Sequence, residues 1–420
     1  MTQLFRELKL FLIEIKKQDL AFIMACFYLI FSYLRPQAIY PALDILPWTQ
    51  ICILAGTGFQ IINNKFKLQF GHFLILLFTL VIYISCIYSQ YPEQSFKNLR
   101  VIFIWLAEVI FFTNCVRGKH QTKLVFIMFL LIIFKMSLFG AKTWVSRGFG
   151  FRDWGIAGPP GFFANSGEFS LLIGMYAMIA IGFLAGFKNK KWIYHLTTIT
   201  AIMTVFGASS RGGQLALLIG LLYTAFIFKK IYLKHIFYGA LLITIMLKII
   251  PEEQMERFSE MGTDNTSLSR LKYWEAGIDM LQKNNLTGVG FYSFPLAYRD
   301  NYKISTPVED EYLANRLEVS HNSFVEVAST LGYPGLLIYI GLIIHIYRLN
   351  KRTIKIFKTK NEPDNWLLTT AKGLNAALLT YIIGSLFMSI AFYPFIYLAL
   401  MLSMVLNTAT SEKVENRSKE

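Results

Sequence analysis

The chain has 420 residues, of which 55% are hydrophobic and only 16% are charged, and its formal net charge is +15 at pH 7. A soluble globular domain has about 25% charged residues. This composition, with a mean hydropathy of +0.46, excludes an ordinary soluble fold. The basic residues stand in short clusters between long apolar blocks, where they act as topology signals of a membrane protein, so no nucleic-acid partner is expected.

The apolar blocks are close to the ~20 residues that cross a bilayer core of ~30 Å as a helix. In lipid every backbone polar group has to be satisfied within the segment, so blocks of this length predict α-helices. We therefore predict an all-α integral membrane protein with about twelve transmembrane helices. The predicted spans are residues 20–34, 45–62, 70–88, 99–116, 123–140, 168–187, 192–208, 214–228, 232–250, 323–346, 367–388 and 390–406.

Clusters of lysine and arginine between the blocks indicate the orientation, because short cytoplasmic loops carry an excess of these residues. The stretches "KNKK" (188–191), "KK" (229–230) and "RLNKRTIKIFKTK" (348–360) are typical of such loops. Both termini are then expected in the cytoplasm.

One loop is far longer than the others and is predicted on the outer side, between the ninth and tenth spans. Structureless loops longer than ~15 residues are uncommon and usually functional. Inside this loop, "SLSRLKYWEAGIDMLQKNN" (267–285) has helical apolar spacing and predicts a helix over the membrane surface, and "LTGVGFYSF" (286–294) predicts a glycine-bearing turn. The expected division is a first bundle of nine spans, an outer loop with short helices, a second bundle of three spans and a cytoplasmic tail, at residues 1–250, 251–320, 321–406 and 407–420.

Two candidate functional residues stand at the outer ends of spans. His321 lies where the long polar loop meets the tenth span, and a neutral imidazole can accept a proton near pH 7. The alternative interpretation is an interfacial histidine that caps the helix with Asn322 and Ser323. Arg211 lies in "GASSRGGQLALL" between two apolar blocks, where an arginine is costly without a partner. Its fork suits a phosphate group, although it could instead snorkel from a tight turn.

Further candidates come from the two outer loops. Arg270 and the nearby Lys272 lie on the predicted outer helix, where a plain solvated or headgroup-bound arginine is the alternative. Arg152 lies in "SRGFGFRDWGIAGPPGFFANSGEFS" (146–170), a glycine-rich aromatic loop that suits sugars or a simple re-entrant loop. No Walker A pattern, acidic pair or cysteine cluster at metal-ligand spacing is present, so neither a cofactor nor a metal is predicted. An anionic, phosphate-bearing substrate reached from outside fits these residues.

Three stretches resemble the O-antigen ligase and O-antigen polymerase (Wzy-type) superfamily of bacterial inner-membrane glycosyltransferases. They are "SHNSFVEVASTLGYPG" (320–335), "SSRGGQLAL" (209–217) and "SRLKYWEAGIDMLQKNNLTGVGFYSF" (269–294). The layout of about twelve spans with a late outer loop also agrees. A fourth stretch, "YLRPQAIYPALDILPW" (33–48), resembles the opening of members associated with exopolysaccharide loci.

The resemblance implies transfer of a glycan from undecaprenyl diphosphate to an acceptor hydroxyl at the periplasmic face, without a metal. The family's histidine matches His321, as the base, and its arginines match Arg211 and Arg270, which bind the donor diphosphate. Lys272, Arg152 and Asn322 are further assisting candidates to which no family role transfers. Membrane lipid surrounds the protein, and the acceptor is either the lipid A core, for a ligase, or another repeat unit, for a polymerase.

A transporter or flippase of a lipid-linked anionic glycan is the alternative function. It predicts charges inside several spans and broken helices near the midplane, whereas only Lys135, Lys248, Lys372 and Glu108 are counted inside spans. A structural scaffold gives no reason for the long outer loop. The sugar, the linkage, the acceptor and the oligomeric state stay open.

Overall fold

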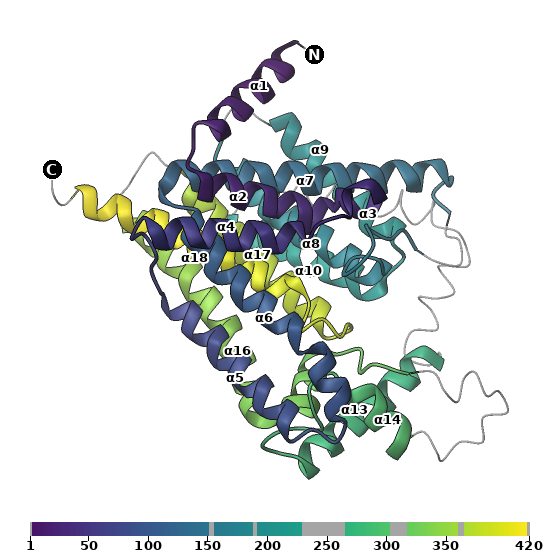
Figure 1. Cartoon of the computed structure of the whole chain (residues 1–420). Coiled ribbons are helices and arrows are strands. Elements are labelled where there is room, and N and C mark those ends of the chain that lie inside the picture. The colour runs from purple at the N-terminus through teal and green to yellow at the C-terminus, as the bar shows by residue number, and fades with distance from the viewer. Residues whose placement is uncertain are drawn as a thin grey trace.

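The computed structural model describes residues 2–150, 155–187, 191–228, 265–302, 317–359 and 365–417. Within these ranges every regular element is a helix, and ten helices are long and apolar enough to cross a membrane (Figure 1). This confirms the prediction of an all-α integral membrane protein. The predicted ninth span, 232–250, lies outside the described residues, so the total of about twelve spans stays a prediction.

The helices follow the predicted spans closely in the described part of the chain. The first span is continued by a π-helical turn, the span at 192–208 forms a short apolar helix, and the surface helix expected in the outer loop is present as α13. The elements are α1 (Thr2–Lys16), α2 (Leu20–Leu29), η1 (Ile30–Leu34), α3 (Pro36–Ile39), η2 (Pro41–Leu43), α4 (Trp48–Ile62), α5 (Phe70–Ile87), α6 (Pro92–Cys115), α7 (Gly118–Ser146), α8 (Ser166–Leu184), α9 (Lys191–Gly207), α10 (Arg211–Phe228), α13 (Asn265–Lys283), α14 (Phe294–Tyr302), α16 (Ser323–Thr359), α17 (Asn365–Ser385) and α18 (Pro394–Arg417).

Helix α16 corrects the prediction that residues 348–360 form a basic cytoplasmic loop, because it continues to Thr359. The reason is a buried stripe at helical spacing, Asn350, Thr353 and Phe357, on the face opposite the exposed basic residues. The Asn407 amide of α18 donates to the Leu349 carbonyl and to Thr353 Oγ1, both at 3.3 Å. The charge pattern alone indicated a loop, but the buried stripe at helical spacing shows that this segment is an amphipathic helix.

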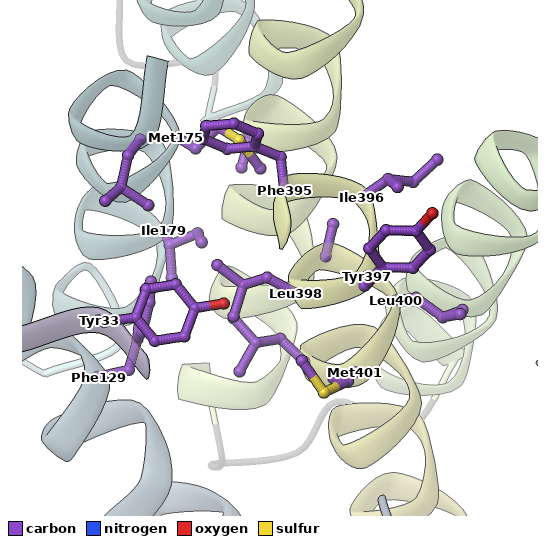
Figure 2. Packing of buried hydrophobic residues seen from close by; sticks show 14 of the residues in the cluster. Tyr33, Phe129, Met175, Ile179, Phe395, Ile396, Tyr397, Leu398, Leu400 and Met401 are labelled. Atoms are coloured by element: carbon purple, nitrogen blue, oxygen red, sulfur yellow. The ribbon is translucent and has the colours of Figure 1, made fainter. Parts of the chain in front are cut away.

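Helices α8 and α18 form the centre of the bundle. Their apolar windows are 83% and 89% buried, more than those of the other candidate spans. Figure 2 shows Phe395, Leu398 and Met401 of α18 packed toward Met175 and Ile179 of α8. The helix packed most extensively against α8 is α17, and α18 packs mainly on α16 and α7.

The turn at residues 285–290, which follows α13, is bonded to a break in α16 at Gly332, where φ is 68° and ψ is −169°. The break leaves carbonyls of α16 without helical partners, and the glycine-bearing turn of the loop uses them. The Val289 amide donates to the Ser329 carbonyl at 2.9 Å, the Gly290 amide donates to the Thr330 carbonyl at 3.3 Å, and the Tyr333 amide returns a bond to the Asn285 carbonyl at 2.8 Å.

Helices α13 and α14 lie at the end of the molecule away from both termini (Figure 1). Two acids join them to each other and to the start of α6: Asp279 binds Lys283 and Tyr302, and Asp300 binds Arg299 and Tyr91. The Lys283 ammonium and then the Tyr302 hydroxyl lower the pKa of Asp279. The Arg299 guanidinium and then the Tyr91 hydroxyl lower the pKa of Asp300.

Candidate functional site

A cavity of about 760 Å³ lies where α8, α10 and α16 begin, between the bundle and α13. Its wall includes Arg211, Arg270 and His321, the three residues that the sequence motifs single out. They come from three segments that are distant in the sequence. The fold therefore places the two arginines and the histidine around one space.

Arg211 is the first residue of α10, and the turn before it is held by close packing. Ser210 Oγ accepts a hydrogen bond from the Gly213 amide at 3.3 Å, in the manner of an N-cap. A Cβ added at Gly213 would lie 1.9 Å from Ser170 Oγ, and one added at Gly212 would lie 2.8 Å from Phe387 Cβ. The two glycines in "SSRGG" are needed for this approach, which sets the arginine at the cavity wall.

Arg270 is carried by α13, which packs directly on the beginning of α16. One turn along α13, the Trp274 indole donates to the Ser320 carbonyl at 3.1 Å. A Cβ added at Gly277 would lie 2.3 Å from Val325 Cγ1, so the two helices are in contact there. These contacts fix the helix that presents Arg270 to the cavity.

His321 lines the cavity, whereas its neighbour Asn322 performs the capping. The Asn322 Oδ1 accepts hydrogen bonds from the Phe324 amide at 2.9 Å and the Val325 amide at 3.2 Å. Ser323 Oγ donates to the Met388 carbonyl at 2.7 Å, which ties this turn to the α17–α18 connection. Asn322 is thus the N-cap of α16 and is absent from the cavity wall.

Strained backbone is concentrated around the cavity. Six non-glycine residues among those described have a positive φ, and three of them line this space: Ser209 (55°), Tyr292 (57°) and His321 (50°). Such conformations cost about 1–3 kcal/mol each and persist where the surroundings over-determine them, often at functional sites. Three strained residues at one wall therefore support a functional role for the cavity.

Two carboxyl groups of the cavity were missed as site residues in the sequence. Glu168 and Glu326 line the wall, and each has a buried Oε2 without a hydrogen-bond partner in the described structure. Burial first, and then Glu168 and Glu326, raise the pKa of Tyr393 to about 12. Glu326 lies within the predicted span 323–346 and belonged with the charged residues counted inside spans. An acid at that depth is itself a functional signal.

The other assisting candidates are not brought to the cavity. Lys272 is exposed on α13 and does not line the wall. Arg152 lies outside the described residues, as does Lys248. The remaining charged residues counted inside spans, Lys135, Lys372 and Glu108, also lie away from this wall.

The cavity has the electrostatic character of an anion site. The first residues of α8 and α10, Ser166 and Arg211, line it, and helix N-termini carry about half a positive charge. Arg211 and Arg270 add two guanidinium groups that can form paired hydrogen bonds to phosphate oxygens. Within the described ranges, no group of three or more His, Cys, Asp or Glu is placed to hold a metal ion.

Residues 196–340 match the family model described as O-antigen ligase, and this stretch contains Arg211, Arg270 and His321. A Rickettsia felis protein named "Putative polysaccharide ligase" is 24% identical over 281 residues, which cover 64% of this chain and 66% of that protein. A Rickettsia prowazekii protein of the same description is 25% identical over 299 residues, which cover 67% of this chain and 68% of that protein. The match thus spans just under two thirds of the first relative's length.

Proposed function

The chain belongs to the O-antigen ligase superfamily through residues 196–340, and we propose that it transfers a glycan from undecaprenyl diphosphate to an acceptor hydroxyl. The observation that carries the proposal is the single cavity lined by Arg211, Arg270 and His321 at the N-termini of three helices. In this proposal the protein is a multi-pass glycosyltransferase of the bacterial inner membrane. Both termini are cytoplasmic and the cavity opens on the periplasmic side.

The donor diphosphate is the leaving group, and its charge grows as the bond to the sugar breaks. Arg211 and Arg270 bind its oxygens through their guanidinium groups. One preorganised donor of this kind contributes ~2.7–4 kcal/mol to transition-state stabilisation in a site that excludes water. Two such donors supply the electrostatic role that a metal ion has in other transferases, so the proposed reaction needs no metal.

The acceptor hydroxyl is a poor nucleophile until a base takes its proton. His321 accepts that proton while the hydroxyl oxygen forms a bond to the anomeric carbon and the electron pair of the breaking bond moves to the diphosphate. A positioned base contributes about 10²–10⁴-fold. Glu168 and Glu326 are the two carboxyl groups in reach of the same space, and they are the alternatives against which His321 has to be tested.

The experiment is a transfer assay with the purified full chain in lipid nanodiscs. The first substrate is a repeat unit linked to undecaprenyl diphosphate, supplied alone. A ladder of longer lipid-linked glycans that disappears with His321→Ala would identify a polymerase. Transfer that begins only when lipid A core is added would identify a ligase. Absence of product with both acceptors would refute the proposed function and favour the transporter.

A further inference from the structure

A second, smaller cavity of about 180 Å³ lies beside the first, between η1, α4 and α6. We propose that it is a subsite for one uncharged sugar ring of the glycan that is transferred or extended. The inference rests on the proposed function for the origin of that sugar. The chemistry of the wall, its strained backbone and its position each point to such a ligand.

The wall of this second cavity carries an unusual set of buried polar atoms without partners. The Tyr33 hydroxyl, Arg35 Nε and Gln37 Oε1 are buried and make no hydrogen bond within the described structure, and the Tyr28 hydroxyl and the Glu108 carboxyl interact with each other beside them. Tyr28, Tyr33 and Glu108 are 0%, 1% and 3% exposed. Because buried polar groups are normally paired, three unpartnered atoms around one small space indicate a missing polar ligand.

Aromatic rings complete the wall and are rigidly held. Trp105 lines the cavity, stacks on Tyr397 with ring centroids 5.4 Å apart, and donates its indole N–H to the Phe392 carbonyl at 2.9 Å. Phe31 lines the opposite part and stacks on Trp48 at 5.1 Å. Fixed aromatic faces beside convergent polar groups are the usual composition of small-molecule sites.

The backbone around Arg35 is strained in a way that serves this cavity. The π-helix η1 (Ile30–Leu34) ends at Arg35, whose φ is 53°. Single π-helical turns occur often at functional sites, and a left-handed non-glycine residue costs about 1–2 kcal/mol. The guanidinium lies directly against Gly161, where an added Cβ would be 1.7 Å from Nη1. The stretch "YLRPQAIYPALDILPW" (33–48) therefore contributes to the wall of the second cavity, although it does not line the first.

The two cavities are neighbours, separated by a pair of packed aromatic rings. Phe162 of the second cavity packs edge-to-face on Tyr393 of the first, with centroids 5.1 Å apart. Pro394 lines the second cavity and is adjacent in sequence to Tyr393. A sugar ring in the second cavity would therefore lie next to the first cavity, on the other side of this aromatic pair.

A neutral sugar fits the wall better than an anion or a lipid chain does. A phosphate site presents donors, whereas this wall opposes Arg35 with the Glu108 carboxyl and the Gln37 carbonyl oxygen. An acyl chain would leave the Tyr33, Arg35 and Gln37 atoms unsatisfied, at a cost of about 1–3 kcal/mol each. Sugar hydroxyls both donate and accept, and can meet the mixed set.

The test measures binding of free sugars to the full chain in nanodiscs by saturation-transfer NMR. The probes are D-glucose, D-galactose, D-mannose and N-acetyl-D-glucosamine. Tyr33→Phe removes one unpartnered hydroxyl but keeps the packing of the ring, so the variant should fold normally and bind the sugar about tenfold more weakly. Glu108→Gln should also weaken sugar binding about tenfold. Tyr176→Phe is the matched control, because Tyr176 is also fully buried with an unpartnered hydroxyl and lines neither cavity.

Binding of at least one probe that both Tyr33→Phe and Glu108→Gln weaken, with Tyr176→Phe unchanged, would support the subsite. No binding by the wild-type chain, or binding that neither substitution weakens, would overturn it in favour of a water-filled space. The transfer assay then identifies which substrate carries the bound sugar. If Tyr33→Phe and Glu108→Gln raise the KM for the lipid-linked donor, the sugar belongs to the donor. If they raise the KM for the acceptor, the sugar belongs to the acceptor. Failed transfer with intact Tyr33-dependent sugar binding would instead refute the proposed function alone.

Discussion

Replacing His321 by asparagine removes the proposed base without disturbing the backbone. His321 has a φ of 50°, and most L-residues pay about 1–2 kcal/mol in that left-handed region, whereas asparagine adopts it more readily. His321→Asn should therefore keep or slightly increase thermal stability. Loss of the base should lower the transfer rate about 10²–10⁴-fold, which corresponds to ~2.7–5.5 kcal/mol at 1.36 kcal/mol per factor of ten.

The adjacent Asn322 gives a matched control with the opposite signature. Its side chain caps α16 through the Phe324 and Val325 amides but does not line the cavity. Asn322→Ala should cost about 1 kcal/mol of stability and retain most of the activity per folded molecule. Transfer is measured at saturating donor, and unfolding by fluorescence-detected melting. A His321→Asn enzyme within about threefold of the wild type would refute the assignment of the base.

Four further outcomes are expected. Arg211→Lys should lower transfer more than tenfold, because lysine cannot form the paired bonds of a guanidinium; equal rates would argue against diphosphate binding there. A chelator should leave transfer unchanged, and loss that a divalent cation restores would contradict a metal-free reaction. Gly288→Ala should lower the free energy of unfolding by ~2 kcal/mol or more, because Gly288 has a φ of +68° and an added Cβ would lie 2.2 Å from an α16 carbonyl carbon. Gly58→Ala is the control, because a Cβ there enters open space and should leave the melting temperature unchanged. Asp279 and Asp300 have lowered pKa values in the folded state. The stability that these two carboxylates contribute is therefore present above the unfolded pKa of ~3.9 and is lost as the pH falls through their folded pKa values. Hydrogen exchange in α13 and α14 should rise only below about pH 4, and a rise at neutral pH would contradict this.

The sequence predicts the spans well because lipid imposes one constraint on every crossing segment, and apolar length alone reports it. The prediction from sequence is wrong where a segment is rich in charged residues but also has a buried helical face. Residues 348–359 are rich in lysine and arginine but are helical, since Asn350, Thr353 and Phe357 form a buried face against α18. The break at Gly332 has a local signal, because Gly332, Pro334 and Gly335 interrupt the apolar run. Its hydrogen bonds to the distant turn at 285–290 could not be predicted from the sequence.

The candidate site was partly predictable for a simple geometric reason. Arg211 and His321 each precede a span and Arg270 lies in the outer loop, so topology alone places them on one side of the bundle. Which residues face one another requires the packing of α13 on α16. Glu168 and Glu326 could have been found as acids at the ends of apolar spans. For the second cavity, Tyr33, Arg35 and Gln37 belong to the stretch 33–48 that the sequence resemblance singled out, but only the fold brings Glu108 of α6 to them.

The most direct measurement of the central claim is the release of undecaprenyl diphosphate in a single turnover, with the purified chain in nanodiscs and a lipid-linked glycan as donor. The account predicts release coupled one-to-one to a new glycosidic bond, lost with His321→Asn and strongly slowed with Arg211→Lys. Release that persists in both variants, or movement of the intact lipid-linked glycan across the bilayer without release, would contradict it.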